Sequence, residues 1–294
     1  MPRLDELIAD LATDAVTYIP VVFRASGIAI LFLLGWGINV QGFDSFRIPF
    51  RKALALRKTD GQAEQIFYGV KALFGTLLAC YISYELCGMY ELPTGQSITL
   101  VLFWLILFSL IAFSRHSIFK EMRVFIHARA IALIRLEVQF VDVLLADALT
   151  SMSKLLADMQ GVLCGVLAIF SHHPEITKFT CIHSFVGPSL ASLPYAIRGF
   201  QCLVLYRQTG NRLQLINFGK YASSFPVIWT SALQHQLAPA EGFVLDQHDR
   251  HLQIIWLYSV TLNTLYSFLW DVVMDWGLAS SPNTHYPLLR DELL

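Results

Sequence analysis

Five long stretches of this chain contain no Asp, Glu, Lys or Arg, and each can cross a bilayer as a helix. A transmembrane helix needs about 20 apolar residues to span about 30 Å of hydrocarbon. A transmembrane strand needs only about 10 residues and alternates apolar with polar positions, which the run Ile98–Phe113 does not do. The five stretches are Ala25–Phe43, Leu92–Ser114, Phe179–Ile197, Tyr221–Ala240 and His251–Trp270.

Two further stretches, about 65–90 and 140–170, are apolar but interrupted by charge, which brings the predicted number of spans to about seven. The chain is therefore predicted to be an all-α, polytopic transmembrane helical bundle. In residues 118–136 a basic residue recurs every few positions among apolar ones. This pattern predicts an amphipathic helix at the cytosolic interface. It favours an interfacial elbow over a sensor of anionic lipid or polyphosphate.

Composition supports the membrane interpretation and excludes several other classes. The chain is 55% hydrophobic and 15% charged, whereas soluble globular chains carry about 25% charged residues. Its formal net charge of −1 gives no basic field for nucleic acid. We find no HExxH, GxSxG or P-loop motif, so we expect no metal, no cofactor and no enzymatic activity. The five cysteines show no CxxC spacing and are interpreted as buried thiols.

Basic residues gather in alternate loops, which predicts the orientation in the membrane. Cytoplasmic loops carry an excess of Lys and Arg. Five basic residues lie between the first two spans, five between the third and fourth, and two follow the fifth, whereas the intervening loops are nearly bare. We therefore expect a lumenal N-terminus, with segment 1–17 outside and a transmembrane domain over 18–294, and a cytosolic C-terminus. Segment 1–17 is acidic, so the first span is expected to act as the uncleaved insertion signal.

The fourth span carries charges at positions that share one helix face. At about 100° per residue, the polar side chains gather on one side and the opposite side is apolar. A charge at mid-bilayer is costly and usually faces a cavity or a partner. The pattern is consistent with a polar pathway or with a salt-bridge ladder between helices. The residues are Asp147, Thr150, Ser151, Lys154 and Asp158.

The last three spans carry further polar residues. Arg198 and Gln201 lie on one face, where an arginine can bind phosphate or carboxylate or can extend to the cytosolic edge. Lys220 and Tyr221 open the sixth span, and this predicts an anion contact at a helix start or a simple interfacial cap. Asp271 and Asp275 are one turn apart, and their mutual repulsion predicts cationic partners among Arg198, Lys220 and Lys154.

Four ordered motifs together resemble the EXS-domain family of phosphate exporters. The resemblance runs from about residue 18 to the C-terminus and is closest to the fungal Erd (ER-retention-defective) Golgi branch, which lacks an SPX domain. Members of the family continue for about two more helices, so the chain is expected to be short at its C-terminus. The motifs are Asp142–Ser151, Pro194–Gly210, Asn217–Phe225 and Trp270–Leu278, with Arg24 and Leu34–Asn39 in the first span.

The resemblance implies a phosphate pathway and a cellular role. It implies a Golgi membrane protein that moves inorganic phosphate from lumen to cytosol and supports glycosylation and retention of resident proteins. The alternative is a non-transporting adaptor that acts through the basic loops 44–58 and 115–135. Implied partners are phosphate and membrane lipids, with a homodimer and Golgi glycosyltransferases or their coat receptor left open. The implied phosphate-binding residues are Asp147, Arg198, Lys220, Tyr221, Asp271 and Asp275, supported by Thr150, Ser151, Lys154, Asp158 and Gln201.

Overall fold

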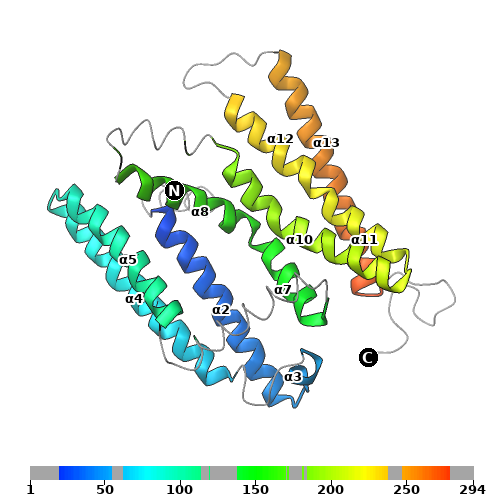
Figure 1. Ribbon diagram of the computed structural model, residues 1–294, viewed down its shortest axis with the longest axis horizontal. Coiled ribbons are helices and arrows are strands. Elements are labelled where there is room, and N and C mark those ends of the chain that lie inside the picture. The colour runs from blue at the N-terminus through cyan, green and yellow to red at the C-terminus, as the bar shows by residue number, and fades with distance from the viewer. Residues whose placement is uncertain are drawn as a thin grey trace, which may run out of the picture. The chain divides into compact units, whose positions relative to one another are not determined.

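The structure, a computed structural model, describes residues 20–54, 62–113, 119, 138–169, 171, 181, 184–237 and 247–278. All regular structure in these residues is helical, as the sequence predicted (Figure 1). The chain divides into two compact units, which are described separately. The first contains residues up to Asp142 together with Leu155–Gly187, and the second contains Val143–Lys154 and the residues from Pro188 onward. The N-terminal segment 1–17 and nearly all of the expected interfacial helix 118–136 lie outside the described residues.

Three long apolar helices form most of the first unit. They are α2 (Val21–Ser45), α4 (Ala63–Met89) and α5 (Pro93–Phe113), and a short helix α3 (Phe50–Ala53) follows α2. α4 packs against both α2 and α5. Apolar side chains fill the contact, among them Val40 of α2, Ile66 of α4 and Phe103 of α5, which are almost completely buried. The ring of Phe23 meets the edges of Tyr81 and Tyr84 at centroid distances of 5.4 and 5.7 Å.

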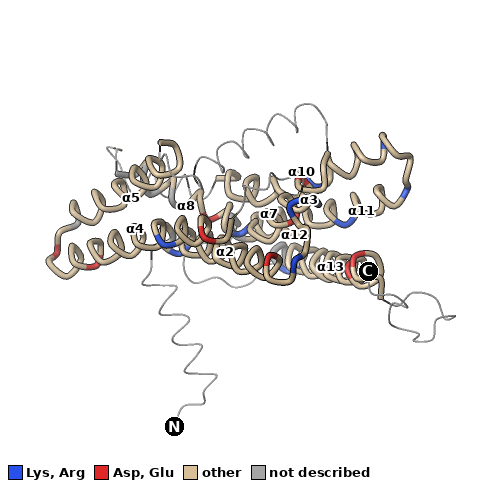
Figure 2. Tube along the Cα trace, turned by 90° about the horizontal axis from the view of Figure 1, so that it is seen from below, with Lys and Arg blue, Asp and Glu red and all other residues tan. Residues whose placement is uncertain are grey.

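These three helices also expose large apolar side chains on their outer faces. Leu31, Ile82 and Phe108 are about half exposed or more. Along α5 the tube in Figure 2 carries no charged residue at all. By length and composition, Val22–Ser45, Ala63–Met89 and Thr94–Phe113 can each cross a membrane. The chain is thus a multi-pass, all-α membrane protein, and the other four predicted spans stay a prediction.

The fourth predicted span is two helices rather than one. α7 (Phe140–Ser151) and α8 (Ser153–Ile169) meet at Met152. At this break the hydroxyl of Thr150 donates to the carbonyl of Asp147 at 2.7 Å, and the Met152 N–H bonds Leu149 three residues back. Such side-chain bonds compete with the helical pattern. The single polar face predicted from Asp147 to Asp158 assumed one continuous helix, and the described helix is interrupted at Met152.

A disulfide in the first unit corrects the interpretation of the cysteines. Cys164 near the end of α8 is bonded to Cys181, and their Cα atoms lie 5.5 Å apart. The buried amide of Gln160 donates to the Cys181 carbonyl and to the Ser184 hydroxyl, so the same segment is held by side-chain hydrogen bonds. Cys80 and Cys202 are buried free thiols, as predicted. The pair was missed because 17 residues separate its members in sequence.

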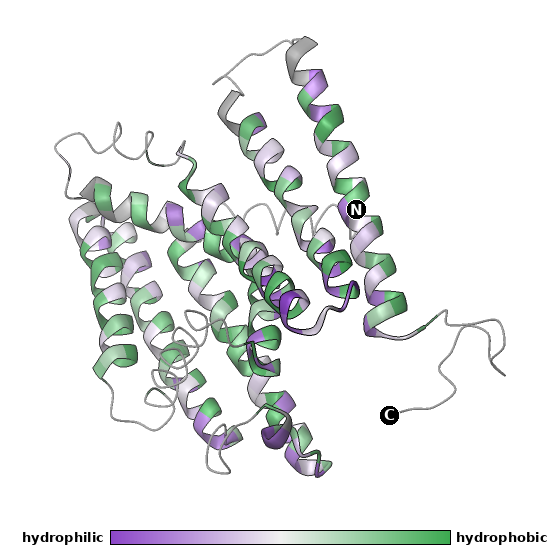
Figure 3. Cartoon of the chain, turned by 45° about the vertical axis from the view of Figure 1, so that its right-hand side comes forward, coloured by the Kyte–Doolittle hydropathy of each residue, from purple (hydrophilic) through white to green (hydrophobic). Residues whose placement is uncertain are grey.

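The second unit contains the remaining long helices. They are α10 (Val186–Thr209, of which the unit holds the part from Pro188), α11 (Leu213–Ala222), α12 (Ser224–Leu237) and α13 (Gln247–Trp270), which continues into a π-helical turn η1 (Asp271–Asp275). α13 packs against α11 and α12. In Figure 3 green apolar residues cover much of each helix, and purple polar residues gather at helix ends and turns.

The sixth predicted span is broken at Ser223, between α11 and α12. Pro226 explains the position of the break, because it has no N–H to donate to the carbonyl of Ala222, four residues back. Lys220 and Tyr221 consequently lie in the last turn of α11. The expectation that they open a helix is wrong, since α11 already begins at Leu213.

Candidate functional site

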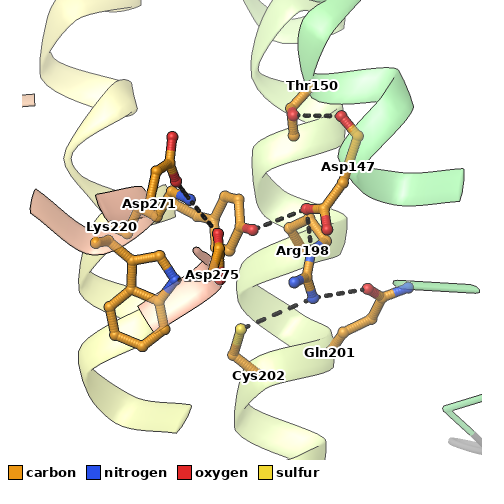
Figure 4. Close-up of polar contacts among 10 residues, drawn as sticks. Asp147, Thr150, Arg198, Gln201, Cys202, Lys220, Asp271 and Asp275 are labelled. Carbon is orange, nitrogen blue, oxygen red and sulfur yellow. Dashed lines mark hydrogen bonds and ion pairs between the residues drawn. The ribbon is translucent and has the colours of Figure 1, made fainter. Parts of the chain in front are cut away.

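A buried arginine joins α10 to α7 within the second unit. The Nε of Arg198 donates to Oδ1 of Asp147 at 2.6 Å. The Nη1 of Arg198 donates to Oε1 of Gln201 at 3.2 Å and lies 4.0 Å from the sulfur of Cys202. Only 5% of the Arg198 side chain is exposed, so its charge depends on these partners rather than on water. Figure 4 shows this network and the neighbouring pairs.

Tyr221 of α11 completes the contact with Asp147. Its hydroxyl donates to the same Oδ1 atom at 2.8 Å. The guanidinium carbon of Arg198 lies 4.8 Å from the centre of the Tyr221 ring, and Nζ of Lys220 lies 5.6 Å from it. Both distances are in the range of cation–π attraction. One phenol therefore contacts the acid of α7 and both cations of α10 and α11.

Lys220 is paired with two acids of the π-helical turn. Its Nζ lies 2.6 Å from Oδ1 of Asp271 and 3.7 Å from Oδ2 of Asp275. The turn is closed by the Trp276 N–H, which bonds the Asp271 carbonyl five residues back at 2.8 Å. The indole of Trp270 donates to Asp275 at 3.2 Å. Single π-helical turns occur frequently at functional sites, and this one presents both acids to the same lysine.

Two glycines allow the helices of the site to approach one another. A Cβ added to Gly199 of α10 would lie 3.2 Å from the ring of Phe218. A Cβ added to Gly219 of α11 would lie 2.7 Å from the hydroxyl of Tyr266, which itself donates to the Ile216 carbonyl at 2.7 Å. A side chain at either position would require Phe218 or Tyr266 to shift. The glycines therefore leave room for the rings of Phe218 and Tyr266 beside the ion-paired residues.

The break between α11 and α12 is held by a residue that the sequence analysis missed. Oδ1 of Asn263 on α13 accepts hydrogen bonds from Ser223 at 2.8 Å and from Ser224 at 3.1 Å. The single O–H of Ser223 is shared between Asn263 and the Lys220 carbonyl, which lies 2.7 Å from the hydroxyl oxygen. Neighbouring elements often satisfy the polar groups that a broken helix frees. The amide of Asn263 is a polar group within the apolar run of α13, and this is the feature of the sequence that could have indicated its role.

The structure brings together all six residues of the predicted binding set. Asp147, Arg198 and Tyr221 form one connected group, and Lys220, Asp271 and Asp275 form the other. Among the supporting residues, Gln201 bonds Arg198, and Thr150 accepts the Tyr195 hydroxyl through its carbonyl at 3.4 Å. Lys154 and Asp158 lie on α8, beyond the break at Met152, and Ser151 is the last residue of α7.

The arrangement offers N–H and O–H donors that can hold an oxyanion. Two cations lie beside the ring of one phenol, and three carboxylates pair with these cations. No group of three or more His, Cys, Asp or Glu side chains that could hold a metal ion occurs in the described part of the chain.

Comparison with known proteins identifies one matching family and several similar proteins. A sequence profile of the EXS family matches residues 19–294. SPX and EXS domain-containing protein 1 of Dictyostelium discoideum is 30% identical over 294 residues, covering 96% of this chain and 30% of that protein. Solute carrier family 53 member 1 of Mus musculus is 23% identical, covering 93% of this chain and 41% of the relative. Protein ERD1 homolog 2 of Schizosaccharomyces pombe is 30% identical over 143 residues, covering 47% of this chain and 36% of that protein. The chain thus spans less than half the length of these relatives.

Proposed function

The chain belongs to the EXS family, and from this premise we propose that it carries inorganic phosphate across the Golgi membrane, from lumen to cytosol. The family includes proteins named as solute carriers and an ERD1 homologue. The proposal makes the protein a carrier rather than an enzyme. Its role is to return phosphate released by lumenal glycosylation reactions, and this return supports the retention of resident Golgi proteins.

The observation that carries the proposal is the joined set of ion pairs in the second unit. Arg198 is buried and Lys220 is largely buried, with side-chain exposures of 5% and 14%. Burying a charge in a membrane helix is costly, so such residues usually mark ion or substrate pathways. An arginine fork and a lysine are the side chains that bind phosphate oxygens best. The acids keep both cations charged and in position between transport events.

Phosphate uptake by proteoliposomes tests the proposal. We expect Lys220→Ala and Arg198→Ala to lower the initial rate at least about tenfold, because each removes a charge-assisted contact with the anion. Matched controls are Lys71→Ala on α4 and Arg207→Ala at the end of α10, which remove the same side chains from exposed positions. The controls should transport at the rate of the unchanged protein. Absence of saturable phosphate flux in the unchanged protein would exclude the carrier.

The adaptor function makes the opposite prediction. If the protein only retains Golgi enzymes through the loops 44–58 and 115–135, neutralising the basic residues of these loops will mislocalise the enzymes. Lys220→Ala will then have no effect on enzyme location. Imaging a resident glycosyltransferase in cells that carry each variant separates the two functions. Ion pairs that join α7, α10, α11 and η1 favour the carrier, because an adaptor has no need of them.

The proposed orientation places the disulfide in the lumen. Disulfides form and persist in oxidising compartments. Cys164 lies on α8 and Cys181 precedes the start of α10 at Val186, next to the loop that the basic-loop pattern assigns to the lumen. Impermeant maleimide added to sealed Golgi vesicles checks this orientation in a background where Cys80, Cys87 and Cys202 are serine. A cysteine at Arg212 should react from outside, and one at Thr94 should react only after permeabilisation. The reverse labelling would contradict the proposed topology.

A further inference from the structure

The ion-pair cluster formed by Asp147, Arg198, Lys220, Asp271 and Asp275 does not have the excess of positive charge expected of a simple anion-binding site. Among the described residues it contains three carboxylates and only two cations. The acidic side chains are also more exposed than the basic ones, the reverse of what an anion-binding surface would show. The acids Asp147, Asp271 and Asp275 have side-chain exposures of 43%, 40% and 54%, whereas the cations are buried. An approaching anion therefore meets carboxylate oxygens as well as N–H donors, and charge attraction alone does not explain its binding.

One carboxylate oxygen is left available at the centre of this arrangement. Oδ1 of Asp147 accepts from both Arg198 and Tyr221, and Oδ2 makes no hydrogen bond to another described residue. An ionised carboxylate can only accept hydrogen bonds. On the donor side, Lys220 has three N–H groups shared between two acids, and Nη2 of Arg198 makes no hydrogen bond to another described residue.

A ligand that satisfies both sides must accept hydrogen bonds and also donate one. Inorganic phosphate does so at neutral pH, because it keeps at least one P–OH group beside its acceptor oxygens. Sulfate has the same tetrahedral shape but keeps no proton at neutral pH. Against a carboxylate it offers only acceptor oxygens, and like charges without a proton between them repel. A site built to bond a substrate hydroxyl strongly rejects the analogue that lacks it.

We propose that Asp147 recognises the proton of phosphate, with the P–OH group donating to Oδ2 while the other oxygens accept from Arg198 and Lys220. This inference rests on the proposed function and names the feature of the substrate that the site selects. In this inference the two carboxylate oxygens of Asp147 have different roles. Oδ1 holds Arg198 and Tyr221 in place, and Oδ2 selects oxyanions that carry a hydroxyl.

Competition in proteoliposomes tests the inference without any variant. Uptake of labelled phosphate is measured against unlabelled phosphate, sulfate and monofluorophosphate, in which fluorine replaces the P–OH group. We expect sulfate and monofluorophosphate to compete at least about tenfold more weakly than phosphate. If phosphate is transported but sulfate competes equally, this inference is overturned and the carrier function stands. If no phosphate is transported, the carrier function itself fails.

The variant Asp147→Asn tests the assigned oxygen. Its amide oxygen can still accept from Arg198 and Tyr221, but an NH₂ donor replaces Oδ2. We expect the preference for phosphate over sulfate to fall at least about tenfold, measured by direct uptake of labelled sulfate as well as phosphate. Asp44→Asn makes the same charge change in the exposed pair with Arg51 and should leave the preference unchanged. An unchanged preference in Asp147→Asn would overturn the role of Asp147.

Discussion

Helices α2, α4 and α5 are held together by apolar packing, whereas α7, α10, α11 and η1 are joined by charged hydrogen bonds. In the first group the buried contacts are made by side chains such as Val40, Ile66 and Phe103. In the second group, contacts between elements are made by Asp147, Arg198, Tyr221, Lys220 and the acids of the π-helical turn. Each unit thus shows a different way of joining helices.

The difference has a physical consequence for function. Lipid tails are as apolar as leucine, so α2, α4 and α5 associate through close packing rather than through a hydrophobic effect between helices. Such contacts are stable but offer nothing to a charged solute. Ion pairs between helices cost desolvation energy, and they can exchange one partner for an anion. The packed unit therefore offers no charged contact to a solute, whereas the ion-paired unit carries the charges on which the proposed substrate site rests.

The largest effect on stability is expected from a cavity in the packed unit. Ile66→Ala removes a side chain that is only 2% exposed and should lower the free energy of unfolding by about 3 kcal/mol. Ile82→Ala on the same helix α4 is the matched control, because Ile82 is 49% exposed and its loss leaves little cavity. Chemical unfolding in detergent micelles measures both. Equal losses would show that packing does not distinguish the two faces of α4.

A somewhat smaller effect is expected in the ion-paired unit. Arg198→Leu leaves the carboxylate of Asp147 with Tyr221 alone and should cost about 2 kcal/mol, less than for a fully buried pair because Asp147 is half exposed. The double variant Arg198→Leu, Asp147→Asn removes the unpaired charge and keeps the acceptor for Tyr221. It should regain most of the stability and still transport no phosphate.

This second prediction separates folding from function in one experiment. Thermal unfolding in detergent and phosphate uptake are measured on the same preparations. Recovery of stability without recovery of transport means that the pair is kept for the substrate rather than for the fold. If the double variant stays as unstable as Arg198→Leu, the arginine contributes packing of its side chain, and the contrast between the two units is weaker than proposed.

Some of the candidate site could be predicted from the sequence. Asp271 and Asp275 repel each other when one turn apart in an apolar run, so their pairing with a cation such as Lys220 was foreseeable. The π-helical form of that turn was not, since it depends on how residues beyond Asp275 fold back. Asn263 was missed because a single amide carries no periodic signal. Its role becomes visible only where α13 lies beside Ser223 and Ser224.

The sequence by itself determined that this protein is helical and lies in a membrane, and which residues carry charge within its apolar stretches. These properties are local, because the length of an apolar run and the cost of burying a charge do not depend on distant neighbours. Only the tertiary structure decided which cysteines pair and which acid meets which base. Those outcomes depend on contacts between residues that lie 17 to 74 positions apart, and no local pattern encodes such distances.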